Sequence, residues 1–270
     1  LFVGLGVFLM NSCEKNSDEV TLTTDQTQVG STYHSLGCNL LSSEEYAKIP
    51  EAEVLNVDVK ATVVTLNVPP VGDQGGEGSC VAWGTTYAAR STNWQANHSA
   101  SWSTSVNIFS PEYVYNQIKS SSSCTSGSYV TSGLDLLKSQ GVCTWATMPY
   151  TDVSCSTLPT IAQKTEAASY KITSYSKITR ITTATLKSYL AAGKPIIVAG
   201  SVNNAFMYLG SGVVLKNFTG SSLGGHCYCI VGYDDNKSAF KFMNSWGTSW
   251  ATNGFGYIGY GYEKKWWSEA

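Results

Sequence analysis

Cys80 ends a glycine-rich stretch, Asp73-Gln74-Gly75-Gly76-Glu77-Gly78-Ser79-Cys80, and a run with helical character follows it. The glycines permit unusual backbone angles and close approach of a ligand. A helix starting at Ser79 as its cap would favour thiolate over thiol through its dipole, and its free amides could donate to an oxyanion. Gln74 could supply a second amide donor. The pattern indicates a nucleophilic thiol; the common alternative is a small buried cysteine.

His226 follows Gly225 at the start of an apolar run that alternates like a β-strand. Alternation places His226 on the same face as Tyr228 and on the opposite face from Cys227 and Cys229. This disfavours a metal site made from His226 and the two cysteines. A lone histidine in a strand is more often structural than catalytic. Its role therefore depends on partners supplied by other segments.

Asn244 begins the segment Asn244-Ser245-Trp246-Gly247-Thr248, at the end of another strand-like run. Its side chain can accept a hydrogen bond from one imidazole nitrogen and fix the histidine tautomer. Trp246 can shield that bond from water. An aromatic-rich hairpin is the structural alternative, but a thiol, a base and an orienting amide together predict covalent catalysis.

These segments, in this order, resemble the papain-like cysteine peptidases. Gly127-Ser128-Tyr129 and Met148-Pro149-Tyr150 also fit the family pattern. The separation of Cys80 and His226 lies in the range usual for that family. The similarity covers about residues 60–262.

The resemblance implies a two-lobed α+β fold, with a helical N-terminal lobe, an antiparallel β-barrel-like C-terminal lobe and the active site between them. It implies hydrolysis of peptide bonds in peptide or protein substrates through a thioester acyl-enzyme, without metal or organic cofactor. Cys80 would be the nucleophile, paired as a thiolate with the imidazolium of His226. Asn244 would orient His226, and Gln74 would stabilise the oxyanion. The residues expected along the substrate cleft are Gly78, Ser79, Gly127, Ser128, Tyr129, Gly225 and Trp246.

The chain departs from the family pattern at several positions. Val81 stands where an aromatic residue usually follows the nucleophile, and Gly225 stands where many members carry a polar residue. Glu77 replaces a cysteine that commonly forms a disulfide, which leaves Cys124 without its usual partner. The long helical inhibitory prosegment is missing, and residues 31–60 are either a short substitute or a lead-in.

Two other functions stay open. One is a Cys–His transpeptidase on the same fold, in which an amine and not water takes the acyl group. The other is a catalytically inactive surface binding protein. Retention of Gln74, Cys80, His226 and Asn244 favours an enzyme.

The chain divides into three parts by texture. Residues 1–13 are a signal or lipoprotein-type segment, residues 14–59 a tether with a candidate short prosegment, and residues 60–270 the catalytic domain. Within that domain we expect a helical lobe at about 75–180 and a β lobe at about 181–262. The predicted helices begin at 42, 79, 110, 130 and 183, and the predicted strands lie at 196–199, 227–232, 240–244 and 254–260.

Eight cysteines are present, and export would place them where disulfides persist. Cys124, Cys143 and Cys155 flank loop-like sequence and are the best candidates. Cys143 with Cys155 is the preferred pair, although connectivity does not follow from sequence.

The first ten residues are almost wholly apolar, too short to span a bilayer and typical of a signal peptide core. The run into Ser12-Cys13 loosely resembles a bacterial lipoprotein signal, with Cys13 as the lipidated residue; an ordinary cleaved signal is the alternative. We therefore expect an exported protein, a cell-envelope lipoprotein or a secreted one, attached to membrane only through Cys13. A formal net charge of −2 and no basic run argue against a nucleic-acid partner, and we expect a monomer.

Overall fold

The computed structural model describes residues 1, 33–55, 57–98, 101–102 and 107–270. Residues Tyr33–Ala270 form one compact unit. Cys13, residues 14–32 of the predicted tether and residue 56 lie outside the described residues. Among the described residues, no helix is both long enough and apolar enough to cross a bilayer.

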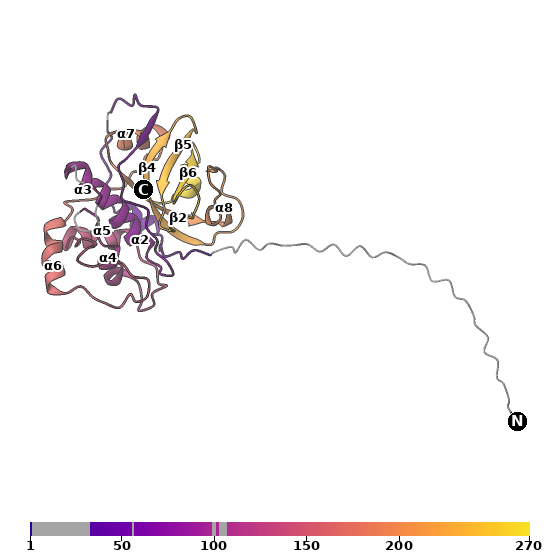
Figure 1. The fold of residues 1–270 in the computed structure, drawn as a ribbon. Helices are drawn as coiled ribbons and strands as arrows, with labels where there is room; N and C mark the ends of the chain where they lie inside the picture. The colour runs from indigo at the N-terminus through magenta and orange to yellow at the C-terminus, as the bar shows by residue number, and fades with distance from the viewer. Residues whose placement is uncertain (2–32, 56, 99–100, 103–106) are drawn as a thin grey trace. The chain divides into compact units, whose positions relative to one another are not determined.

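Helices dominate the first half of the compact unit (Figure 1). The segments α2, η1 and α3 follow one another without a break, so one long helical stretch begins at Cys80, and its middle part is π-helical. The helical elements are α1 (Ser43–Ala47), α2 (Cys80–Ala82), η1 (Trp83–Arg90), α3 (Ser91–His98), α4 (Pro111–Ile118), α5 (Val130–Ser139), α6 (Ile161–Ala167), η2 (Ala168–Tyr170), α7 (Thr183–Ala191), α8 (Asn204–Met207) and α9 (Glu263–Trp266).

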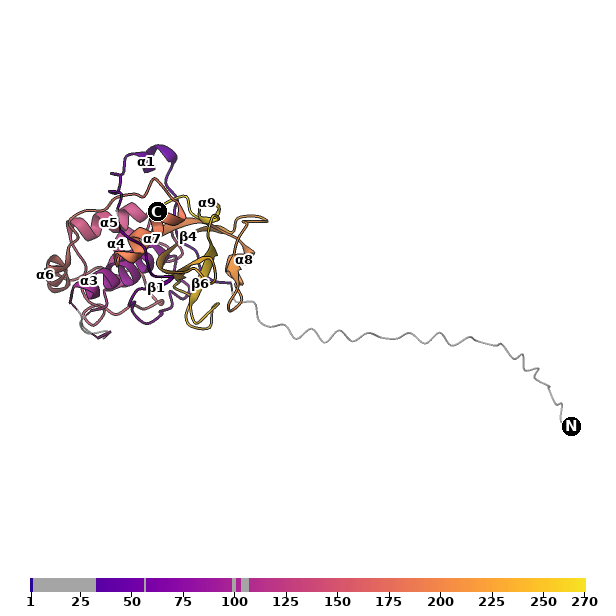
Figure 2. The same ribbon diagram turned by 90° about the horizontal axis from the view of Figure 1, so that it is seen from above.

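Strands dominate the second half and form one sheet in the order β1-β4-β5-β6-β3, with β2 also paired to β4. All described pairings are antiparallel except that of β3 with β6. The strands are β1 (Val63–Thr65), β2 (Ile196–Val202), β3 (Val214–Leu215), β4 (Gly224–Asp234), β5 (Ala239–Met243) and β6 (Phe255–Gly259). The predicted α+β class is confirmed, and α3 to α6 lie to one side of the sheet in both views (Figures 1 and 2).

Local sequence chemistry accounts for most helix ends. Ser110 caps α4 through the amide of Tyr113, with Pro111 in the first turn. Gly141 and Gly193 follow α5 and α7 with φ of 86° and 75°, where a side chain would be strained. Ser79 is different from what we predicted: its side chain makes no cap bond, because its Oγ pairs with the Tyr150 hydroxyl at 2.8 Å.

Strand β4 separates two apolar clusters, as its alternation predicts. Tyr228 and Ile230 pack with the large core of the β half, whereas Cys229 and Val231 pack against the helical stretch that follows Cys80. The strand that carries His226 is thereby fixed from both faces. Since α2 and β4 are in contact, the start of the long helical stretch lies against the start of this strand.

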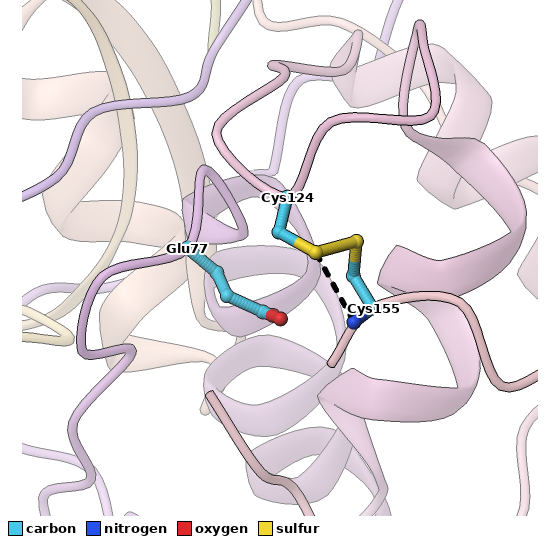
Figure 3. Close-up of side chains that lie close together, drawn as sticks. All are labelled: Glu77, Cys124 and Cys155. Carbon is cyan, nitrogen blue, oxygen red and sulfur yellow. Dashed lines mark hydrogen bonds between the residues drawn. A yellow bond between two sulfur atoms is a disulfide. The ribbon is translucent and has the colours of Figure 1, made fainter. Parts of the chain in front are cut away.

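The disulfide is not the one we preferred. Cys155 pairs with Cys124, with their Cα atoms 5.5 Å apart (Figure 3). Cys143 is a free, buried thiol. Cys143 packs in the helical core among Phe109, Val142 and other apolar side chains, so it is a core residue and not a bridge. Cys124 therefore has a partner although Glu77 replaces the usual cysteine. The loop that carries Cys155 lies beside Glu77 and brings its sulfur to Cys124.

Candidate active site

Cys80 is the first residue of α2 and is completely buried. The backbone amides of Cys227 and Gly37, two residues far away in the sequence, act on its thiol to lower the pKa, although burial acts more strongly in the other direction. Cys227 directly follows His226, so the sheet and the helix bring the predicted thiol and the predicted base into one place. Cys38, Cys80 and Cys227 share one small apolar cluster.

His226 is fully buried and oriented by two neighbours. Its Nε2 lies 2.8 Å from Oδ1 of Asn244, and its ring stacks on Trp246 with centroids 4.5 Å apart. Because a carboxamide oxygen can only accept, Nε2 carries the proton and Nδ1 is the free basic atom. Nδ1 has no hydrogen-bond partner among the described residues, which leaves it available to the thiol.

Gln74 is held at both ends of its side chain. Its Oε1 accepts from the Ser245 hydroxyl at 2.7 Å, and its Nε2 donates to the carbonyls of Glu77 at 2.9 Å and Ser35 at 3.1 Å. Tyr150 supports the same loop by donating to the Gln74 carbonyl at 2.7 Å. The amide nitrogen of Gln74 is therefore directed at a peptide carbonyl.

The Ser35 carbonyl belongs to residues 34–40, a segment that we name the strap. The strap pairs with the predicted substrate-binding backbone: Ser128 donates to Gly37, Asn39 donates to Ser128, and Cys38 donates to Gly225 at 3.1 Å. At its start, His34 stacks on Trp246 with centroids 4.7 Å apart. The strap thus occupies the cleft that the sequence predicted for a substrate.

Glycines on both sides make room for the strap. A Cβ on Gly37 would stand 2.0 Å from the carbonyl oxygen of Gly78, and one on Gly225 would stand 2.1 Å from the carbonyl oxygen of Cys38. A Cβ on Gly127 would stand 2.8 Å from Oδ1 of Asn39. Of the predicted cleft residues, Gly78, Gly127, Ser128, Gly225 and Trp246 all contact the strap. Tyr129 is 40% exposed and precedes α5, and Ser79 points to Tyr150.

Burial of the site changes the electrostatics that the sequence predicted. Burial raises the pKa of Cys80 to about 12, against the opposing effect of the amides around its sulfur. Burial also lowers the pKa of His226 to about 4, although the hydrogen bond with Asn244 acts in the other direction. The covered site therefore favours a neutral thiol and a neutral imidazole, not the expected ion pair, because desolvation of two charges outweighs the helix dipole.

Sequence reasoning missed several residues that shape the site. Ser245 anchors Gln74, and Tyr150 holds the loop, but neither carries a pattern that reveals this role. Glu269 accepts a hydrogen bond from the Leu41 amide at 2.6 Å and fixes the far end of the strap. Glycine at position 37, beside Cys38, is the only hint in the sequence that this stretch makes a close approach.

Glu77 lies next to the disulfide (Figure 3). Its carboxylate and the sulfurs of Cys124 and Cys155 lie within 4.8 Å of one another. Two bonded sulfurs are not thiolates, so this trio is not a metal-ligand set while the disulfide is intact. Burial raises the pKa of Glu77 to about 7, and its Oε2 lies 3.1 Å from the Tyr150 hydroxyl oxygen.

The fold and the site together define an α+β protein in which a cysteine at a helix start, a histidine on a strand and an asparagine gather in one cleft. The chain belongs to the papain family of cysteine proteases: the family model described as "Papain family cysteine protease" matches residues 55–267.

Relatives and solved structures agree with this. The chain is 29% identical over 202 residues to an uncharacterized peptidase C1-like protein of Acanthamoeba polyphaga mimivirus, covering 70% of this chain and 64% of that protein. It is 30% identical over 196 residues to Cathepsin B-like CP2 of Giardia intestinalis, covering 70% of this chain and 63% of that protein. The chain thus spans just under two thirds of the length of these two relatives.

Two solved structures share the fold. Xylellain, a cysteine protease from Xylella fastidiosa, superposes with a TM-score of 0.69 at 24% identity, covering 85% of this chain and 90% of that one. The bromelain protease from Ananas comosus superposes with a TM-score of 0.61 at 21% identity, covering 74% of this chain and 90% of that one.

Proposed function

We propose that the protein hydrolyses peptide bonds with Cys80 as nucleophile and that the strap holds it in a latent form. One observation carries the proposal: an extended polypeptide segment lies in the cleft, with its Ser35 carbonyl held by Gln74 and its Gly37 amide directed at the Cys80 sulfur. The cleft therefore already shows how it accommodates a peptide backbone. The thiol beneath that backbone is inaccessible until the strap leaves.

In the open site, water and a free helix end favour transfer of the Cys80 thiol proton to Nδ1 of His226, which gives a thiolate and an imidazolium. Cys80 Sγ attacks the scissile carbonyl carbon, and Nε2 of Gln74 donates to the oxygen that becomes negative. His226 gives its proton to the leaving amine, which leaves a thioester on Cys80. His226 then takes a proton from water, which attacks the thioester and releases the acid.

Asn244 and Trp246 keep the base oriented through this sequence. Oδ1 of Asn244 accepts a hydrogen bond from Nε2–H of His226, so Nδ1 faces the thiol in every step. Trp246 stacks on the imidazole and excludes water from that bond. Loss of the Asn244 or Trp246 side chain would leave the imidazole of His226 in the site but no longer hold it in position.

A thiol probe tests the proposal. The full chain and a chain that begins at Ser42 are treated with an epoxysuccinyl reagent, and adducts are mapped by mass spectrometry. We expect fast labelling at Cys80 alone in the shortened chain, slow labelling in the full chain, and loss of fast labelling in His226→Ala. Slow labelling spread over several cysteines in both chains would contradict the proposal.

Peptide turnover by the shortened chain, with Cys80→Ala as the blank, completes the test. The products with and without an added amine separate hydrolysis from acyl transfer. Binding of peptides without turnover would favour an inactive binding protein.

For residues 1–13 we propose export with Cys13 as a lipid attachment site, supported only by the apolar run and the Ser12-Cys13 pair. Expression of the natural gene followed by detergent partition tests it. A protein that stays in the aqueous phase and carries no acyl mass on Cys13 would count against the anchor.

A further inference from the structure

A recess of about 430 Å³ lies beside the loop that carries Gln74. Three aromatic side chains, Trp83, Trp145 and Tyr150, and two carboxylates, Asp73 and Asp152, line it. None of the strap residues 34–40 is among its lining residues, so the recess is distinct from the covered cleft. Nothing in the proposed chemistry of Cys80 uses it.

The three rings are inclined to one another and pack edge to face or tilted, so they do not form a flat stack. The ring centroids of Trp83 and Tyr150 are 4.9 Å apart at 73°, and those of Trp83 and Trp145 are 6.0 Å apart at 65°. Trp145 and Tyr150 are 6.4 Å apart at 34°. Aromatic faces carry negative charge density and attract cations, most strongly when several rings surround one position.

Two exposed carboxylates flank the same loop residue, Gly75. Oδ1 of Asp73 accepts from the Gly75 amide at 2.8 Å, and Oδ2 of Asp152 lies 2.1 Å from the place where a Cβ of Gly75 would stand. Neither carboxylate forms an ion pair with Lys or Arg in the part of the chain that the structure describes. Two carboxylates without a Lys or Arg partner in the described part of the chain, next to aromatic rings, make a recess that attracts positive charge.

Asp152 also acts on the buried carboxyl group of Glu77. Burial raises the pKa of Glu77, and the nearby carboxylates of Glu112 and Asp152 act in the same direction; Lys119 is the cation that opposes them.

We propose that this recess binds the positively charged side chain of a Lys or Arg residue in a polypeptide substrate. Its rim is joined to the cleft, because Asp73 pairs through its backbone with Trp246, and the strap touches Gly76 through the Ser35 hydroxyl at 2.8 Å. A chain that leaves the cleft past Trp246 therefore passes Asp73 and reaches the recess. The inference rests on the proposed peptide substrates and adds a side-chain preference that acts away from the reacting bond.

The test uses the full chain with Cys80→Ala, which binds without turning over. N-acetyl-arginine amide is titrated while the indole N–H signal of Trp145, assigned with Trp145→Phe, is followed by two-dimensional nuclear magnetic resonance. N-acetyl-citrulline amide has nearly the same shape without the charge. We expect the arginine compound to shift the Trp145 signal and the citrulline compound to bind about tenfold more weakly.

Two double variants that each remove two negative charges form a matched pair, one at the recess and one away from it. Asp73→Asn with Asp152→Asn should weaken arginine binding about tenfold, whereas Glu44→Gln with Asp58→Asn, both far from the recess in sequence and exposed, should not. Higher salt should weaken binding to the unmodified recess. Equal binding of both compounds, or shifts that bypass Trp145, would overturn the inference, and neither result bears on the reactivity of Cys80.

Discussion

Nε2 of Gln74 donates a hydrogen bond to the carbonyl oxygen of Ser35 at 3.1 Å, and the same oxygen accepts from Nε1 of Trp246 at 3.3 Å. A peptide carbonyl from the chain's own N-terminal part thus sits between two donors of the site. The two donors bind a peptide carbonyl oxygen, which is the group that a peptide substrate would present to them. One set of residues would therefore serve both the proposed latency and the proposed catalysis.

The first prediction concerns Gly37. Gly37→Ala should release the strap, because the new Cβ would stand 2.0 Å from the Gly78 carbonyl oxygen, a contact that real side chains do not make. We expect labelling of Cys80 by a thiol reagent to become at least about tenfold faster, which corresponds to about 1.4 kcal/mol of lost strap affinity.

Gly76→Ala is the control for this variant, because a Cβ at position 76 would meet nothing within 4 Å. Its labelling rate should equal that of the parent chain. Equal rates in both variants and the parent would mean that the strap does not limit access to Cys80.

The second prediction concerns the support of Gln74. Ser245→Ala removes the hydrogen bond to Oε1 at 2.7 Å and frees the amide to rotate. In the shortened chain, kcat/KM should fall up to about tenfold with an unchanged pH profile. Gln74→Ala should cost about 10²–10³ in rate, because it removes the donor itself. A loss in Ser245→Ala that Gln74→Ala does not exceed would argue against an anchoring role.

The third prediction is a pH dependence of strap opening. Burial lowers the pKa of His226 from 6.5 to about 4, and burial also lowers that of His34, with Asp73 acting in the other direction. The open form therefore binds protons more tightly, so falling pH between about 6.5 and 4 favours opening. Labelling of Cys80 by a disulfide reagent active in acid, relative to a free thiol peptide, should accelerate over this range. A ratio that falls with acidification would contradict the expected coupling.

The fourth prediction concerns Glu77, which is 1% exposed. Its pKa is raised from 4.5 to about 7 in the folded protein, so the folded state binds the extra proton between these values. Stability from this group is thus present at low pH and lost as pH rises through about 7. Glu77→Gln should remove about 1–3 kcal/mol of that pH dependence in urea unfolding between pH 5 and pH 8.

Glu44→Gln is the control for Glu77→Gln, since Glu44 is exposed and paired only with Lys48. It should keep the slope of the parent protein. Parallel slopes for the parent and Glu77→Gln would show that Glu77 is ionised in the fold at both pH values.

The fifth prediction concerns the disulfide. Cys124→Ser with Cys155→Ser should lower the free energy of unfolding by about 2–4 kcal/mol, since the bridge closes a loop across a sequence separation of 31. Peptide mapping without reduction should show the Cys124–Cys155 link, with Cys143 alkylated only after unfolding. Finding Cys143 in a bridge would instead support the pairing that the sequence favoured.

Local elements were predictable because their causes are local. Ser110-Pro111 fixes the start of α4 through a cap and a preset φ, and Gly141 ends α5 through a positive φ. The alternation of β4 was predictable for the same reason, since side chains of neighbouring residues must point to opposite faces. Ser79 failed as a cap because a distant hydroxyl, that of Tyr150, competes for its oxygen.

By itself, the sequence determined which residues could do the chemistry and in which order they occur: Gln74, Cys80, His226 and Asn244 carry side chains whose donor, nucleophile and base properties are intrinsic. Only the tertiary structure decided what state they are in. Contacts between segments far apart in the chain place the strap over Cys80 and bring Cys124 to Cys155. Such contacts also bury His226 and lower its pKa, which favours the neutral imidazole. Desolvation is a property of the assembled packing, and no local pattern of residues encodes it.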